Sequence, residues 1–175
     1  MSGPNRYYGI YRATVVENVD PMFLGRLLVI VPDVGGITPS TWAMPCVPIA
    51  GKQMGVFVVP QLGAGVWVQF EGGDPDYPVW TGGWWGNPAE VPLVALAGVP
   101  ASPNIVLQTS LQNALVISDL PGPAGGVMLC AGPVATPTSP RIMVTETGII
   151  ITNGIATIML EGPSVTINNG ALVVI

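Results

Sequence analysis

The stretch TNGIATIMLEGPSVTINNG, residues 152–170, has glycine at every eighth position and a single charged residue, Glu161. Written in eights from residue 147, the chain reads TGIIITNG, IATIMLEG, PSVTINNG and ALVVI, so each complete octad ends in glycine. Gly154, Gly162 and Gly170 each follow Asn or Glu, and such pairs suit a corner at which the backbone takes positive φ. The sequence therefore predicts short strands that are joined at glycine corners.

The third and fifth positions of these octads are almost wholly apolar and mostly β-branched. Residues of this kind favour strands, and side chains two positions apart in a strand share a face. The two columns are therefore predicted to face a common core, made of Ile149, Ile151, Met159, Val165, Ile167, Val173 and Ile175.

Two architectures fit this repeat. One is an antiparallel meander of hairpins within one chain, and the other is a trimeric, intertwined β-helix or β-prism that stacks octads from three chains around an axis. A single sheet has no second layer of its own to cover its apolar columns, whereas three chains would bury them and pair the strand edges. Burial of this kind also explains how so apolar a segment stays in solution, so we favour the trimer.

The composition indicates an all-β protein. Hydrophobic residues make up 49% of the 175 residues, and 23 glycines and 19 prolines interrupt any long helix, which argues against both disorder and a helical fold. No apolar run is long enough to span a membrane, and the N-terminus MSGPNRYYG lacks a secretion signal pattern, so we expect a soluble chain. Cys46 and Cys130 lie far apart without a CxxC motif, and we expect two buried thiols in a reducing compartment.

Charge divides the chain, because eleven of the fifteen charged residues lie in residues 1–90. Five β-rich runs separated by turn residues in that half predict a five-stranded OB-fold barrel. We expect the OB-fold domain over residues 1–88, a proline-rich linker over 89–103 and a β-helical needle over 104–175.

The residues argue against catalysis and against nucleic-acid binding. With no histidine, the chain holds neither a Ser-His-Asp triad nor a zinc site built on histidine, and we expect no metal or cofactor. Asp74 and Asp76 could serve as paired glycosidase carboxylates, but their proline-bracketed loop favours a turn, so we expect no enzyme. Residues 1–90 carry seven acids against four bases, so their aromatic residues are expected in core and interface rather than under stacked bases.

Three motifs in the first half are more specific than the strand count. They are GRLLVIVPD at residues 25–33, AGKQMGVFVVPQLGAGVWVQF at 50–70 and GGDPDYPV at 72–79. Together they make residues 20–85 resemble the OB-fold domain of phage baseplate assembly protein V and of type VI secretion Vgr-type spike proteins. Related spike proteins carry a trimeric β-helix after that domain, so the resemblance also favours the trimer.

The resemblance implies the central spike of a contractile injection apparatus, in a phage tail or a tail-like particle. Such a homotrimer would be assembled in the bacterial cytoplasm, dock on a baseplate hub protein and the tail tube, and touch a target membrane only transiently while piercing it. A tip protein rich in Pro-Ala-Ala-Arg is expected to bind the apolar platform of Ala171, Leu172, Val173, Val174 and Ile175. The alternative is a trimeric structural fibre or adhesin-like tail module without a piercing role.

Overall fold

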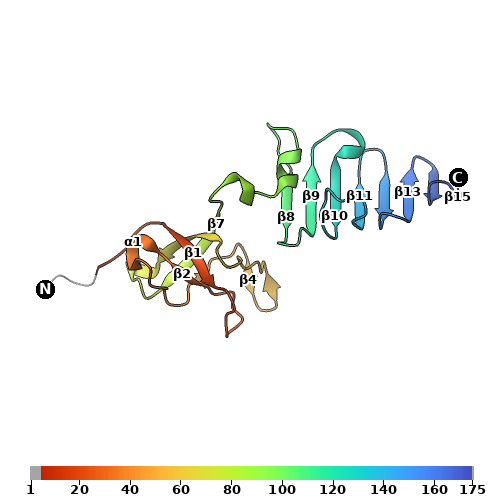
Figure 1. The fold of residues 1–175 in the computed structure, drawn as a ribbon. Coiled ribbons are helices and arrows are strands. Elements are labelled where there is room, and N and C mark those ends of the chain that lie inside the picture. The colour runs from red at the N-terminus through yellow and green to blue at the C-terminus, as the bar shows by residue number, and fades with distance from the viewer. Residues whose placement is uncertain (1–4, 175) are drawn as a thin grey trace. The chain divides into compact units, whose positions relative to one another are not determined.

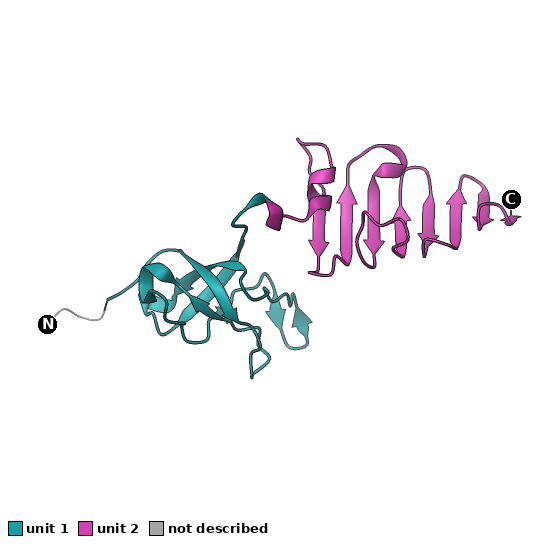
Figure 2. Cartoon of the chain, in the orientation of Figure 1, with its two compact units in different colours: residues 1–88 teal, residues 89–175 magenta. Residues whose placement is uncertain are grey.

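The computed structural model describes residues 5–174, and it is almost entirely β, which confirms the predicted fold class. The chain divides into two compact units between Pro88 and Ala89 (Figure 2). No helix in the described residues has the length and hydropathy that a membrane crossing needs.

The first unit is built on a five-stranded sheet with the strand order β2-β1-β6-β7-β3. Its strands are β1 (Tyr11–Glu17), β2 (Leu28–Ile30), β3 (Met44–Pro45), β6 (Gly65–Phe70) and β7 (Pro78–Trp84). The unit also contains the hairpin of β4 (Ala50–Gly51) and β5 (Met54–Gly55), the short helix α1 (Pro32–Gly35) and the 3-10 turn η1 (Glu71–Gly73). Each of the five sheet strands comes from one of the five β-rich runs of the sequence, and only the β3–β7 pair is parallel.

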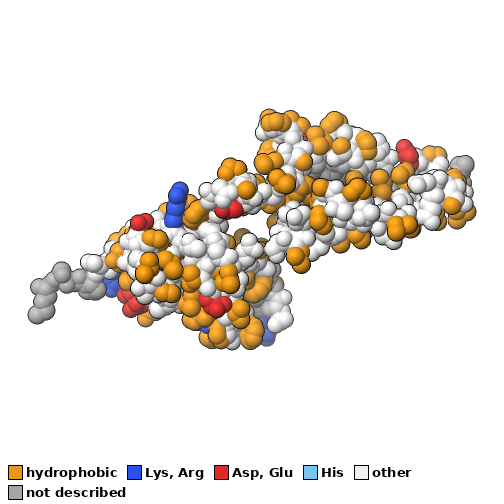
Figure 3. Space-filling model, in the orientation of Figure 1, with side chains coloured by type: hydrophobic (Ala, Val, Ile, Leu, Met, Phe, Trp, Pro, Cys, Tyr) orange, Lys and Arg blue, Asp and Glu red, His pale blue; other side chains and the backbone are white. Residues whose placement is uncertain are grey.

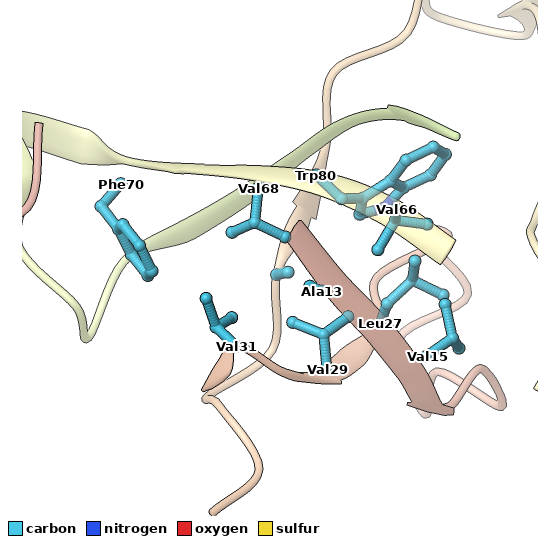
Figure 4. Close-up of a cluster of buried hydrophobic side chains, with 10 residues drawn as sticks. Ala13, Val15, Leu27, Val29, Val31, Val66, Val68, Phe70 and Trp80 are labelled. Carbon is cyan, nitrogen blue, oxygen red and sulfur yellow. The ribbon is translucent and has the colours of Figure 1, made fainter. Parts of the chain in front are cut away.

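The core of the first unit is made by alternate residues of its strands. Val66, Val68 and Phe70 of β6 point inward together, as expected for a period of two, and each is at most 8% exposed. They pack with Ala13, Val15, Leu27, Val29, Val31, Ala43 and Trp80 in one cluster (Figure 4). Trp80 also donates its indole N–H to the carbonyl oxygen of Gly25 at 3.1 Å, so its polar atom is satisfied inside the core.

The second unit is an eight-stranded antiparallel meander, in which each strand pairs with the strands before and after it in the chain (Figure 1). The strands are β8 (Ile105–Gln108), β9 (Ala114–Ser118), β10 (Gly126–Cys130), β11 (Arg141–Val144), β12 (Ile149–Thr152), β13 (Thr157–Glu161), β14 (Ser164–Ile167) and β15 (Leu172–Val174). Two 3-10 turns accompany them, η3 (Leu93–Ala97) and η4 (Gly122–Ala124), and a third, η2 (Pro88–Glu90), spans the boundary between the units.

The octads therefore pair with one another inside a single chain, as in the meander that the sequence analysis placed second. The physical reason lies in the corners. Gly154, Gly162 and Gly170 have φ values of 88°, 53° and 96°, and Asn168 and Asn169 also have positive φ. Turns of this conformation reverse the chain so tightly that the next strand returns along the previous one. A trimer remains compatible with these hairpins, because the sheet keeps an uncovered face.

The proline-rich segment 89–103 is not a simple connector. The Asn104 side chain donates to the carbonyl oxygen of Val94 at 2.8 Å, and the Asn104 backbone N–H donates to the carbonyl oxygen of Ala95 at 3.1 Å. Both bonds tie η3 to the start of β8. The segment consequently belongs to the second unit.

The two cysteines differ in burial. Cys130, the last residue of β10, is 7% exposed, as expected. The prediction that Cys46 is buried is wrong, because the structure exposes this thiol. Cys46 directly follows β3, the last strand in the order of its sheet.

Candidate functional site

The hairpin registers of the second unit decide which side chains share a face. Residues directly opposite each other in an antiparallel pair lie on the same side of the sheet. Ile151 of β12 is opposite Ile158 of β13, and Ile158 is in turn opposite Ile167 of β14. An odd-numbered residue therefore faces an even-numbered one across each of these hairpins, and between β10 and β15 the residues on one face change parity from strand to strand.

Following these registers through the sheet gives two continuous ladders on one face, each with one residue from every strand. The first ladder is Ile105, Ile117, Val127, Val144, Ile149, Leu160, Val165 and Val174. The second ladder is Leu107, Leu115, Leu129, Ile142, Ile151, Ile158, Ile167 and Leu172. Every member is Ile, Leu or Val, and we call this surface the ladder face.

The ladder face is uncovered in the single chain. Ile105 and Leu107 at one end are 67% and 69% exposed, and Leu172 and Val174 at the other end are 54% and 56% exposed. Hydrophobic side chains recur along the whole length of this unit in the space-filling view (Figure 3). Contiguous apolar surface of this extent is typical of a protein interface, because soluble monomers rarely leave it in water.

The opposite face of the sheet is mixed. Its central ladder is apolar in part and includes Val116 and Met128, but its flanks carry Gln108, Arg141, Thr152, Thr157 and Glu161. Val116 is only 3% exposed, so this face is already packed near β9. All polar and charged strand residues of the sheet thus lie on the face opposite the ladders.

The predicted core residues are divided between the two faces. Ile149, Ile151, Val165 and Ile167 belong to the ladder face, as the octad columns required. Met159 and Val173 lie on the opposite face, so the prediction that the columns share one face is wrong for them. The reason is the parity change across each hairpin, which puts Ile158, Leu160, Leu172 and Val174 on the ladder face instead. Ile175 lies outside the described residues.

The predicted corner glycines lie in the turns between β12 and β15. A Cβ added to Gly154 would lie 2.3 Å from the Cα of Thr138, in the turn that joins β10 and β11. A Cβ added to Gly162 would meet nothing within 4 Å. Backbone conformation therefore favours glycine at both positions, and close packing adds a second requirement at Gly154.

The first unit carries a separate apolar groove of about 540 Å³ beside the β4–β5 hairpin. Leu24, Met44, Met54, Phe57 and Trp80 are among the residues that line it. Phe57 is 71% exposed and the adjacent Val58 is 68% exposed, so the groove opens to solvent with large apolar side chains at its rim. Sequence analysis used Phe57 only as part of a motif and did not predict this groove.

Asp20 organises the loop before β2, and the sequence analysis missed it. Its carboxylate accepts bonds from the Arg26 guanidinium at 2.6 and 3.0 Å, and from the backbone N–H groups of Met22 at 3.0 Å and Leu24 at 2.8 Å. The Arg26 bond and these amides hold the pKa of Asp20 well below its usual range, against the opposing effect of burial. The signal available in the sequence was an acid five residues before Gly25 and six before Arg26.

Asp74 and Asp76 behave as turn residues. Asp74 forms an ion pair with Arg6 at 2.9 Å and accepts the backbone N–H of Asp76 at 3.2 Å, which is an Asx turn. Residues 5–174 contain no group of three or more His, Cys, Asp or Glu side chains placed to hold a metal ion. Most of the aromatic residues pack within the first unit, where Tyr7 and Tyr11 contact Phe70 and Trp67 contacts Trp84.

An OB-type barrel followed by a meander with one bare apolar face defines a protein that associates through its second unit. Comparison with protein-family models agrees with this class. Residues 11–85 match the type VI secretion system/phage-baseplate injector OB domain, and residues 104–173 match the phage baseplate V C-terminal trimerisation domain. The chain therefore belongs to the family of phage baseplate protein V and Vgr-type spike proteins, as the sequence motifs indicated. No curated protein matches the chain at a significant level.

Proposed function

We propose that this protein is the central spike of a contractile injection apparatus, in which three chains close around one axis with their ladder faces inward. The observation that carries the proposal is the ladder face, whose sixteen positions, two from each of eight strands, are all aliphatic. The match to a trimerisation domain over the same residues supports three copies. In this β-prism each chain supplies one wall, and the mixed faces form the outside.

Such a prism would be stiff for two reasons. Main-chain hydrogen bonds run between neighbouring strands along the whole wall, and aliphatic side chains from three walls fill the interior. Burying an exposed Val, Leu or Ile contributes roughly 1.5–3 kcal/mol, and the part of this gain that remains to the half-exposed ladders opposes the entropic cost of association. A needle of this kind can transmit force from a contracting sheath to a target envelope, whose membrane it would touch only transiently.

The first unit would join the spike to the rest of the particle. We propose that the OB unit docks on the baseplate hub protein and the tail tube, because its match is to an injector OB domain and its Phe57 groove is an exposed apolar surface. Assembly would take place in the bacterial cytoplasm, before the spike becomes part of a virion or an injection particle.

A trimeric fibre or adhesin-like tail module without a piercing role is the second candidate, because the ladder face alone would serve it equally well. Cryo-electron microscopy of the native particle separates the two. The spike predicts density for three copies on the axis below the tail tube, whereas copies at the particle periphery would support the fibre and contradict the spike.

The strand β15 is the place where we propose that a tip protein binds. Leu172, Val173 and Val174 are each about half exposed, and β15 pairs only with β14 among the described strands, so its other edge is open. A small tip protein rich in Pro-Ala-Ala-Arg could continue the strand pairing on Ala171, Leu172, Val173, Val174 and Ile175.

Deletion of residues 171–175 tests this tip site. The truncated chain should still form trimers through the remaining ladder positions, but the tip protein should be lost when the spike is pulled down from the native particle. Substitution of the outward-facing Met159 by Ser serves as the control and should leave the tip protein in place. Recovery of the tip protein at full level with the truncated chain would contradict the site.

A further inference from the structure

The two lateral edges of the second unit carry opposite charge. Successive turns of a meander alternate between its two sides, so the turns at residues 119–125, 145–148 and 162–163 lie along one edge. The turns at residues 109–113, 131–140, 153–156 and 168–171 lie along the other edge. We call them the acidic edge and the basic edge, for the charged residues that each one holds.

All three acids of residues 104–175 lie on the acidic edge. Asp119 and Glu146 are in its turns, and Glu161 is the last residue of β13, next to the turn at residues 162–163. The single base of this region, Arg141, is the first residue of β11 and directly follows the turn at 131–140 on the basic edge. None of the four takes part in an ion pair among the described residues of this unit.

We propose that Arg141 of one chain pairs with Glu146 of the next chain, three times around the trimer. Closure of identical chains by a threefold axis uses a head-to-tail contact, so the basic edge of each wall must meet the acidic edge of its neighbour. Arg141 begins β11 and Glu146 lies in the turn that follows β11, so they occupy the same level at opposite edges. Walls that stand level therefore bring these two groups together at each corner.

Both groups are held in position at their own edge. The Nε of Arg141 donates to the carbonyl oxygen of Ser139 at 3.1 Å, and its guanidinium also donates to Thr136. Glu146 accepts the backbone N–H of Gly122 at 2.7 Å, from the neighbouring turn of the same edge. An arginine has five N–H donors and a carboxylate about four acceptor sites, so each keeps capacity for the other. The pair would fix the register of three otherwise uniform aliphatic walls.

A threefold rotation keeps the three walls level, because a slide of each wall past the next would not close into a ring. Neighbouring strands are about 4.8 Å apart, and the ladders repeat Ile, Leu and Val at every level, so aliphatic burial alone would also permit an open assembly in which one wall is displaced by two strands. Such a slide would move Arg141 away from Glu146 and toward the level of Asp119 or Glu161. The charged edges therefore favour the closed, level trimer over displaced, open assemblies.

Chemical crosslinking of paired cysteines tests this arrangement, which rests on the proposed trimer. The variant carries Arg141→Cys and Glu146→Cys in a background with Cys46→Ser and Cys130→Ala, because Cys130 lies directly opposite residue 141 in the β10–β11 pair. Within one chain, positions 141 and 146 are about 16 Å apart at roughly 3.3 Å per residue, too far for an intrachain bond. Arginine and glutamate can pair with their Cα atoms farther apart than the roughly 7 Å that a disulfide spans, so a short bismaleimide is used as the crosslinker. It should convert most chains into a covalent trimer on a denaturing gel.

The matched control replaces Glu146→Cys by Glu161→Cys, which lies on the same edge at another level, and it should give mostly uncrosslinked chains. If the 141/161 pair crosslinks and the 141/146 pair does not, the proposed register is wrong. Light scattering before crosslinking separates the two proposals. A trimer that fails to crosslink at 141/146 overturns only this pairing, whereas the absence of any trimer overturns the proposed function.

A charge exchange gives a second readout. Arg141→Glu alone should lower the urea midpoint of trimer dissociation, and the added change Glu146→Arg should recover part of that loss. Arg141→Glu with Glu161→Arg should recover none of it. Recovery should also diminish at 1 M salt, where the Debye length is about 3 Å. Equal recovery by the two exchanges would contradict a specific pairing of Arg141 with Glu146.

Discussion

At the scale of single residues, a few side chains and glycines fix the local geometry on which both units depend. Gly154 and Gly162 allow hairpin turns at positive φ, and Asp20 ties a loop of the first unit through five bonds to Met22, Leu24 and Arg26. The octad spacing identified the glycines, because glycine is the residue that adopts positive φ without a steric cost. It could not identify Asp20, whose role depends on which backbone groups the folded loop brings around it.

The two corner glycines should differ in their tolerance of alanine. A non-glycine residue in the left-handed region costs about 1–2 kcal/mol, so Gly162→Ala should lose roughly that much stability. Gly154→Ala should lose more, because its Cβ would also lie 2.3 Å from the Cα of Thr138. Guanidinium unfolding of the two purified variants measures the difference. A loss at Gly154 no greater than that at Gly162 would show that the contact with Thr138 is not a constraint.

Asp20 should make the stability of the first unit depend on acid. Its folded pKa lies below the unfolded value of about 3.9, so its contribution is present above that pH and is lost as the pH falls below it. Asp20→Asn should lower Tm at pH 7, and the difference in Tm between the two proteins should shrink between about pH 4 and pH 2. Thermal melts across this range measure it. A constant difference in Tm would contradict the role assigned to the Asp20–Arg26 pair.

At the scale of the elements, the sequence predicted strands well and their registers badly. The five β-rich runs became the five strands of the first sheet, since alternation of buried and exposed residues is local information. The octads likewise became β12, β13 and β14, with the final ALVVI forming β15. Four of the six predicted core residues that the structure describes lie on the ladder face, and two do not, because the turns between β12 and β15 pair odd-numbered residues with even-numbered ones. The geometry of each turn, rather than the eight-residue period, determines which residues pair across a hairpin.

Neighbouring residues of β13 test the assigned faces. Ile158 is on the ladder face and Met159 on the opposite one. Ile158→Glu would put an ionised carboxylate among the aliphatic side chains of three walls, and we expect it to abolish the trimer. Met159→Glu should leave most of the trimer intact, because its side chain is on the outside. Size-exclusion chromatography with light scattering measures the trimer fraction of both variants. A greater loss of trimer with Met159→Glu than with Ile158→Glu would show that the octad columns, and not the ladders, face inward.

At the scale of the whole molecule, the account depends on one property, the burial of the ladder face by two further copies. The sequence favoured a trimer, because few charged residues accompany many aliphatic residues after residue 104. The sequence did not predict that each wall of the trimer is a hairpin meander. A meander and an intertwined β-helix show the same alternation of side chains along each strand. The structure resolves this by showing pairing within the chain and an apolar face that one chain leaves bare.

The mass of the purified protein in solution tests this claim most directly. One chain has a mass of 18.1 kDa, so three chains give 3 × 18.1 = 54.3 kDa. Multi-angle light scattering at micromolar concentration should give that mass in a single symmetric peak that persists on dilution. A stable, monodisperse species at 18.1 kDa would contradict the account, because the ladder face would then remain in water.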